Sequence, residues 1–291
     1  MWLLLRRLIS DRNSWLPELT SLFFLLHPLV TEPVNWISGR TDLLAGLFVA
    51  AAFFVAHADE FKARHGRGFG LGFCLLLGGM AKETALMAVF VLFVSAFWPG
   101  SPFYESWRAH RRSLCFWLAS AVGVYLMLRT GGSLVRDAGL VSAVAGAHDA
   151  AQISLFNKLA GAVRALGFYS RKLVWPFPLN LAIVEIQRNI CFIFGLIAAG
   201  GLLVLVAIRR GVAGFWVFSA FLFLAPALLV GVQKMAWTPL AERYLYLPLF
   251  CLSLALFSVL ENKRLLWQKC LAVLLLPMAV ISVQRTYVWQ S

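Results

Sequence analysis

The segment from residue 27 to residue 56 begins with ionisable side chains and ends in an uncharged apolar run. Its first sixteen positions include His27, Glu32, Arg40 and Asp42. Charged groups beside lipid are costly, and they usually face the interior of a helix bundle or a water-filled cavity. The cluster therefore favours a functional site. The alternative explanation is that these groups are ordinary caps and ion pairs at helix ends.

Five more ionisable residues lie at the ends of other apolar runs: Lys82, Glu83, Arg129, Glu242 and Arg243. Arginine can bind phosphate oxygens in a bidentate manner, and lysine acts as a point charge. Carboxylates can orient sugar hydroxyls, hold the basic side chains, or act as acid or base. The mixture predicts a site for a phosphate with hydroxyl-rich cargo, and spacing alone does not divide these roles. The sequence has no P-loop, HExxH, GxSxG or CxxC motif.

Apolar runs of helical length must position these residues. The chain is 61% hydrophobic and its mean hydropathy is +0.80, which indicates a protein built for lipid. The runs fall near residues 15–29, 42–58, 68–81, 84–98, 114–128, 190–208, 212–232, 245–260 and 265–283. We therefore predict an all-α, polytopic membrane protein of about nine transmembrane helices, although several runs are shorter than the roughly 20 residues of a full span.

The distribution of basic residues predicts the orientation. The formal net charge is +13, but the basic residues separate apolar runs and no nucleic-acid-binding motif accompanies them, so topology explains the charge better than nucleic acid does. One set of connections carries most of the lysine and arginine, which makes it cytoplasmic: Arg6, Arg7, Arg12, Lys62, Arg64, Arg67, Arg108, Arg111, Arg112, Arg209, Arg210, Lys263, Arg264 and Lys269. The ionisable residues named above then lie on the outer side. We expect an integral protein of a bacterial inner membrane whose site faces the periplasm or exterior.

A long outer connection, residues 129–189, contains one further helix. Ser154 is suited to cap its N-terminus, and apolar residues recur at helical spacing on one face: Leu155, Leu159, Val163, Leu166 and Leu173. Lys158, Arg164, Arg171 and Lys172 are expected to project elsewhere. The pattern predicts an amphipathic, basic helix at the outer leaflet.

Two compositional features have structural explanations. The glycine-rich stretch "GFGLGFCLLLGG" lies in an apolar run, where close helix packing explains it better than a phosphate loop. The five cysteines also lie in apolar runs without metal-ligand spacing, so we expect buried free thiols.

Five segments resemble one known family in the same order along the chain. "HPLVTEPVNWISGRTDLLAGLF", "GGMAKETALMAVFVLF", "RALGFYSRKLVWPFPLNL", "LAERYLYLPLFCLSLAL" and "RTYVWQS" resemble segments of the transmembrane-and-TPR O-mannosyltransferases and their bacterial relatives. The matches extend from about residue 23 to residue 291. The resemblance implies a single membrane domain of the GT-C glycosyltransferase superfamily.

The resemblance implies transfer of a sugar from a polyprenyl-phosphate carrier to a protein or glycan acceptor on the outer face. The implied substrate-binding residues are His27, Glu32, Arg40, Asp42, Lys82, Glu83, Glu242, Arg243 and Tyr244, and the resemblance also covers Trp175 and Pro176. Arg129 joins the candidate substrate-binding residues because it is ionisable and lies at the end of an apolar run. Arg40, Lys82 and Arg243 would hold the leaving phosphate. The implied partners are membrane lipid, the lipid-linked sugar and its acceptor. Nothing in the sequence requires a metal, although the carboxylates are compatible with a divalent cation.

The chain departs from the family pattern at both ends. Compared with the family, it lacks the first two spans, the first outer loop and the C-terminal TPR repeats, and the catalytic base is expected upstream of Met1. Glu32 and Asp42 are the alternative candidates for that base. Two other functions stay open from the sequence: a transporter or flippase for lipid-linked sugars, and a membrane relative without catalysis.

Overall fold

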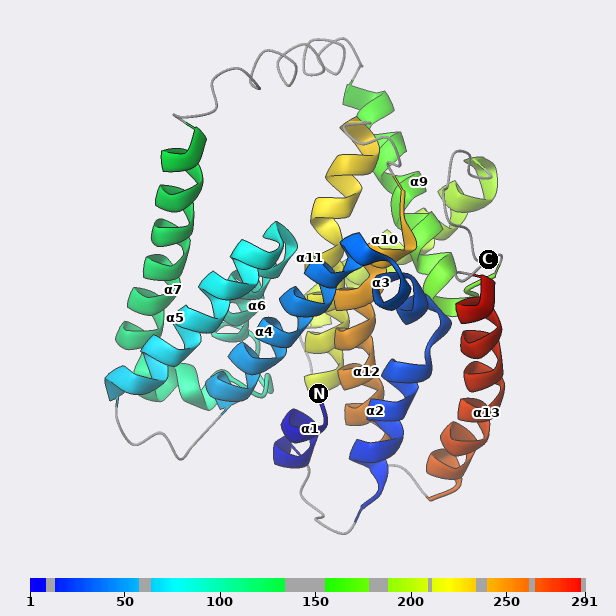
Figure 1. The fold of residues 1–291 in the computed structure, drawn as a ribbon, viewed down its shortest axis with the longest axis horizontal. Helices are drawn as coiled ribbons and strands as arrows, with labels where there is room; N and C mark the ends of the chain where they lie inside the picture. Colours follow the sequence, from blue (N-terminus) through cyan, green and yellow to red (C-terminus); the bar gives the residue numbers. More distant parts are fainter. Residues whose placement is uncertain are drawn as a thin grey trace.

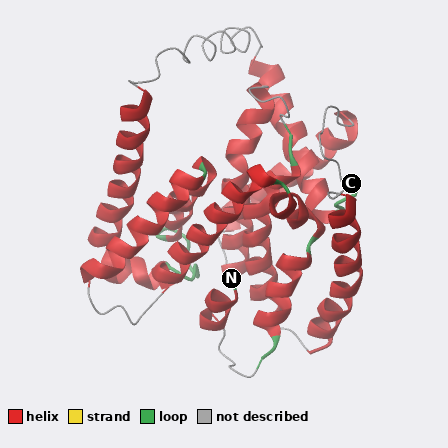
Figure 2. Ribbon diagram, in the orientation of Figure 1, coloured by secondary structure: helices red, strands yellow, loops and turns green. Residues whose placement is uncertain are grey.

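The computed structural model describes the chain in eight stretches, and every regular element in them is helical (Figures 1 and 2). The described stretches are residues 1–8, 14–57, 64–133, 155–177, 188–208, 211–233, 240–261 and 265–288. This confirms the all-α prediction for that part of the chain.

Short helical turns connect long helices at the end of the molecule where the candidate site lies. The long and medium helices are α1 (Trp2–Leu8), α2 (Leu16–Leu26), α4 (Arg40–His57), α5 (Arg64–Ala81), α6 (Met87–Ser95), α7 (Tyr104–Ser133), α9 (Leu155–Val174), α10 (Arg188–Ile208), α11 (Gly211–Gln233), α12 (Tyr246–Leu260) and α13 (Leu265–Val288). The short elements are η1 (Pro28–Val30), α3 (Thr31–Asn35), η2 (Ile37–Gly39), η3 (Glu83–Leu86) and η4 (Glu242–Leu245).

Every apolar run of the sequence contains a helix, but these helices differ in length. Among the described residues, five segments are long and apolar enough to cross a membrane: Ile37–His57, Asn189–Ile208, Gly211–Leu229, Glu242–Leu260 and Leu266–Val288. Helices α2 and α6 have 11 and 9 residues. At about 1.5 Å per residue they are shorter than a hydrocarbon core of about 30 Å. The membrane class is supported, whereas the count of nine spans is not confirmed.

Aromatic side chains form the centre of the core. Phe53 of α4 lies 5.5 Å from Trp216 of α11 between ring centroids, and Phe103 lies 5.8 Å from the same indole. All three rings are buried. Large aromatic rings bury much apolar area in fixed edge-to-face geometries. They join α4, α11 and the segment before α7 into one packed unit.

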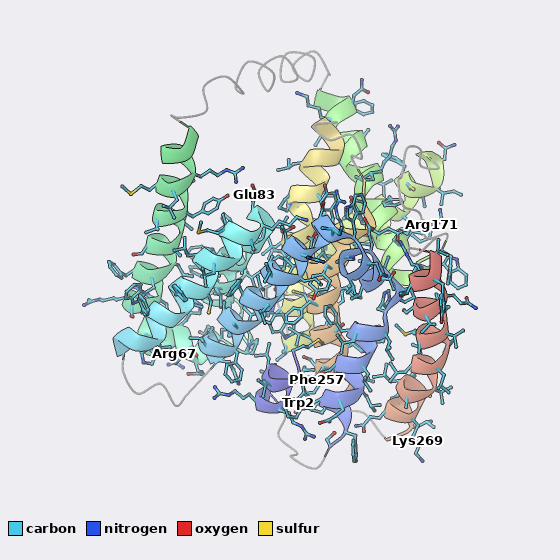
Figure 3. The ribbon with its side chains drawn as sticks, in the orientation of Figure 1. Trp2, Arg67, Glu83, Arg171, Phe257 and Lys269 are labelled. Atoms are coloured by element: carbon cyan, nitrogen blue, oxygen red, sulfur yellow. The ribbon has the colours of Figure 1, made fainter. Side chains whose placement is uncertain are left out.

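The basic residues assigned to the cytoplasmic side gather at one end of the bundle where the structure describes them. Arg67 and Lys269 lie at the lower end in Figure 3, whereas Glu83 and Arg171 lie in the upper half. Arg67 is buried, and it donates hydrogen bonds to the Val55 carbonyl at 3.2 Å and to Ser106 Oγ at 2.7 Å. It therefore satisfies carbonyl groups at the C-terminal end of α4, where helices lack intrahelical partners.

The helix expected in the long outer connection is α9, and glycine fixes it against α10. A Cβ atom on Gly167 would lie 1.7 Å from the Cys191 carbonyl oxygen, and one on Gly195 would lie 1.9 Å from that of Val163. Small residues allow two helix backbones to approach this closely. The predicted helix is confirmed from Leu155 onward, and Ser154 lies outside the described residues.

One expectation for α9 was wrong. Lys172 was expected to project away from the packed face, but it is only 5% exposed. The middle of α9 is buried against α10 and α11, because the helix is part of the bundle rather than an element lying on its surface. Conversely Leu159, placed on the apolar face, is exposed.

The glycine-rich stretch of α5 has the packing role that its sequence indicated. A Cβ atom on Gly72 would lie 3.1 Å from the carbonyl oxygen of Trp117, and one on Gly78 would lie 3.2 Å from Cβ of Ala85. All five cysteines are free. Cys191 and Cys251 are buried as expected, but Cys115 and Cys270 are exposed on α7 and α13, where an apolar helix face can meet lipid.

Candidate functional site

Seven charged residues meet at the upper end of the bundle, and we call them the outer charge cluster. They come from five helices or turns and from the residue that precedes η3: Glu32, Asp42, Lys82, Lys172, Glu242, Arg243 and Arg285.

A tight series of turns between α2 and α4 places the two carboxylates of the first segment. His27 ends α2, and its Nδ1 accepts a hydrogen bond from the Leu29 backbone N–H at 3.3 Å. Pro28 follows as the first residue of η1. Gly39 packs so closely on α3 that an added Cβ would lie 2.6 Å from the Pro33 carbonyl oxygen. Any larger residue at position 39 would displace this turn.

The deepest part of the cluster is one carboxylate between two cations. Glu242 Oε1 lies 2.7 Å from Lys172 Nζ, and Glu242 Oε2 lies 2.8 Å from an Arg285 guanidinium nitrogen. All three side chains are less than a tenth exposed. Buried charges persist only when they are paired, because removing one partner leaves an uncompensated charge. This triad fixes α9, η4 and α13 to one another.

Glu32 is the second buried carboxylate, and it contacts the neighbour of Glu242. Its Oε2 accepts a hydrogen bond from the Arg243 backbone N–H at 3.0 Å, while its Oε1 lies 4.0 Å from the Arg243 guanidinium. Burial raises the pKa of Glu32 to about 7. Glu242 adds to the shift, and Arg243 and Arg285 oppose it. Glu32 can therefore change its charge near neutral pH.

Aromatic rings hold the two cations nearest to solvent. The Arg243 guanidinium lies 4.8 Å from the centre of the Trp36 ring and 5.6 Å from that of Tyr244. Lys82 Nζ lies 5.2 Å from the Tyr244 ring, and it also pairs with Asp42. Within the described part of the chain, the Arg243 guanidinium donates no hydrogen bond. Its orientation is set by ring contacts, which leave its donors available for a ligand.

The exposure of these side chains arranges the charges in depth. Arg243 and Lys82 are 19% and 17% exposed, whereas Glu32 and Asp42 are 1% and 7% exposed. With every group ionised, four cations face three carboxylates. The cluster therefore has one positive charge in excess and presents its cations toward solvent. Such an arrangement favours a bound anion.

The structure places the residues expected from sequence in two groups. Glu32, Asp42, Lys82, Glu242, Arg243 and Tyr244 lie together. The other expected residues lie apart: Glu83 and Arg129 form a separate exposed ion pair, Arg40 is exposed at the first residue of α4, and His27 is engaged in its local turn. Trp175 is exposed beyond the end of α9, and the carbonyl of Pro176 accepts a hydrogen bond from Lys172 Nζ at 3.4 Å.

Sequence reasoning missed Lys172, Arg285 and Trp36. Each lies within one of the five segments that carry the family resemblance, which is the signal that could have identified them. Within the described residues, no group of three or more His, Cys, Asp or Glu side chains could hold a metal ion.

No family model, no curated protein and no solved structure matches the chain.

Proposed function

We propose that this chain is the membrane domain of a glycosyltransferase that takes a sugar from a polyprenyl-phosphate carrier at the outer face of the membrane. The observation that carries the proposal is the outer charge cluster, in which Arg243 and Lys82 are the most exposed members and the carboxylates lie behind them. A lipid-linked phosphate is an anion that reaches such a site from the membrane. The five segments that resemble O-mannosyltransferases supply the cluster residues.

The proposed reaction is a single displacement at the anomeric carbon. The hydroxyl oxygen of the acceptor forms a bond to this carbon, the bond to the phosphate oxygen breaks, and the carrier phosphate leaves with the electron pair. Arg243 and Lys82 stabilise the negative charge that develops on the leaving phosphate. The hydroxyl proton passes to a carboxylate base.

The remaining cluster members position these two cations. Asp42 pairs with Lys82, and Glu32 accepts the backbone N–H of Arg243. Glu242 holds the preceding position of the chain through Lys172 and Arg285. We assign Arg40 no contact with phosphate, because its side chain is exposed outside the cluster.

The proposed topology has nine membrane helices, with the cluster facing the periplasm or exterior. Five of them are long enough to cross the membrane alone. The shorter α2 and α6 are extended by the turns η1 and η3, so we propose that they cross together with these turns, with α3 at the outer end of α2. Unwound backbone at that depth is tolerated where it is buried in protein or lines a cavity.

A transfer assay tests the proposed function. Membranes are prepared from cells that express the gene encoding this chain, or the same gene with Arg243→Ala, and are supplied with a radiolabelled polyprenyl phosphosugar. We expect label in protein or glycan only with the natural residue. Movement of the intact lipid-linked sugar across the membrane, without transfer of its label to protein or glycan, would instead identify a transporter.

A further inference from the structure

A groove runs along the outer half of the molecule between α2, α3 and α13, next to the outer charge cluster. Its volume is about 390 Å³. It is lined by Leu25, Leu26, Val30, Thr31, Val34, Asn35, Ala279, Ser282, Val283, Thr286 and Tyr287. None of these residues belongs to the cluster, and the proposed reaction uses none of them.

The groove is apolar at one end and polar at the other. Leu25 and Ala279 lie at the end nearer the middle of α13, whereas Asn35 and Thr286 lie at the end nearer the C-terminus. Ala279 and Thr286 are seven positions apart on α13, which corresponds to about 10 Å along the helix axis. The lining therefore matches an amphiphile whose hydrocarbon chain points into the membrane and whose head lies at the outer surface.

The groove is open on the side that a membrane protein turns toward lipid. Leu25, Val34 and Val283 are 62%, 56% and 55% exposed. Two hydrogen bonds hold its walls together: Ser282 Oγ donates to the Leu26 carbonyl at 2.7 Å, and Asn35 Nδ2 donates to Thr286 Oγ1 at 3.4 Å. The groove therefore lies between two elements that are already joined, and a ligand can enter it sideways from the bilayer.

Only the short helix α3 separates the groove from the cluster. Thr31 lines the groove and Glu32 belongs to the cluster. At the other end of α3, Asn35 lines the groove and the next residue, Trp36, lies against the Arg243 guanidinium. On α13, Thr286 lines the groove directly after Arg285. The polar end of the groove is thus one residue along the chain from Trp36, whose ring contacts Arg243.

We propose that this groove binds the isoprenoid chain of the phosphate-headed lipid whose head group binds the outer charge cluster. This inference rests on the proposed function and adds the path of the lipid. The apolar lining fits the chain, the lateral opening admits a ligand that never leaves the membrane, and the excess positive charge of the cluster attracts its phosphate. The carrier would thus approach the outer charge cluster from the side of the molecule that α2 and α13 form.

Photolabelling tests the groove without requiring sugar transfer. The purified chain in nanodiscs is irradiated with a polyprenyl phosphate that carries a diazirine near its phosphate end, and the labelled peptides are identified by mass spectrometry. Val283→Trp fills the groove. Val280→Trp is the matched control, because Val280 is equally exposed on α13, at 56%, but does not line the groove. We expect label on the α2–α3 and α13 peptides, a loss of about tenfold with Val283→Trp, and no change with Val280→Trp.

Competition identifies the ligand chemistry. Unlabelled polyprenyl phosphate should displace the probe, whereas phosphatidylethanolamine and a neutral polyprenol should not. Equal labelling of both tryptophan variants, or equal competition by phosphatidylethanolamine, would overturn the inference, since the groove would then hold only bulk lipid. Equal competition by the polyprenol would overturn the link to the cluster. If label appears elsewhere on the chain and is lost in Arg243→Ala, the assignment of the groove is wrong and the proposed function stands. An absence of labelling anywhere would contradict both.

Discussion

Lys172 and Glu242 form an ion pair of 2.7 Å across seventy positions of the chain, with side chains only 6% and 0% exposed. Arg285 binds the other oxygen of the same carboxylate. Glu242 directly precedes Arg243, so the pair fixes the part of the chain that presents the proposed phosphate ligand. The triad is thus a structural support for the more exposed half of the cluster.

Removing one cation of the triad should destabilise the protein. Lys172→Met leaves Glu242 buried with Arg285 alone, and breaking a buried ion pair costs about 3–5 kcal/mol. Thermal unfolding in detergent should show a clear decrease in the midpoint temperature. Arg171→Met is the control, because Arg171 precedes Lys172 on α9 and is only half-buried. Adding Glu242→Gln to Lys172→Met should recover part of the loss. An unchanged midpoint temperature in Lys172→Met would show that the ion pair carries no stability.

The contact between α9 and α10 should tolerate no side chain at Gly195. A Cβ atom there would lie 1.9 Å from the Val163 carbonyl oxygen, whereas one on Gly200 of the same helix would meet nothing within 4 Å. We expect Gly195→Ala to lower the unfolding temperature and Gly200→Ala to raise it slightly, since alanine is favoured over glycine in helices by about 1 kcal/mol. The reverse order would mean that α9 does not pack on α10 in this register.

Cysteine accessibility tests the proposed topology. In a background free of native cysteines, Ser38→Cys should react with an impermeant thiol reagent in intact cells, because Ser38 is exposed in the η2 turn. Arg111→Cys and Lys269→Cys should react only after the cells are opened, although both positions are also exposed. Reaction of the latter pair from outside would overturn the orientation and, with it, the outward-facing site.

Carrier binding should strengthen as the pH falls. The pKa of Glu32 is raised to about 7, so Glu32 is charged at pH 8 and mostly protonated at pH 6, and its protonation gives the cluster one more positive charge. A polyprenyl phosphosugar is a suitable probe because its phosphodiester keeps one charge over this range. We expect its affinity to be several-fold and up to about tenfold higher at pH 6 than at pH 8. In Glu32→Gln the affinity should be constant and as high as that of the natural protein at pH 6. A variant that retains the full pH dependence would exclude Glu32 as its source.

The helices could be predicted from sequence because each apolar run of helical length indicates one. Each of the nine runs contains a helix. The gathering of Asp42, Lys82 and Arg243 agrees with the predicted orientation of those runs, which places the three residues at the same side of the bundle. The lengths of α2 and α6 were not predictable in this way, because prolines and turns interrupt the runs locally.

The membership of the cluster needed the three-dimensional structure. Arg40 and Asp42 are two positions apart on α4, which turns them by about 200° around the helix axis. Only Asp42 can therefore face the cluster. Lys172 was assigned to the exposed side of α9 because one apolar face suggested a helix lying on lipid. The buried partner that reverses this assignment, Glu242, lies on a distant turn, and no periodicity within α9 could reveal it.

The most direct test of the central claim is the affinity of a short-chain polyprenyl phosphosugar for the natural protein, Arg243→Lys and Arg108→Lys in detergent. Lysine keeps the charge at position 243 but loses the planar fork of donors. A charge-assisted hydrogen bond is worth roughly 1.5–3 kcal/mol, so Arg243→Lys should weaken binding by about ten- to a hundredfold. Arg108→Lys should bind like the natural protein, because Arg108 is exposed at the opposite end of the bundle and pairs with Glu105 on the same helix. Equal affinities for all three proteins would contradict the account and leave Arg243 as a structural residue of the turn.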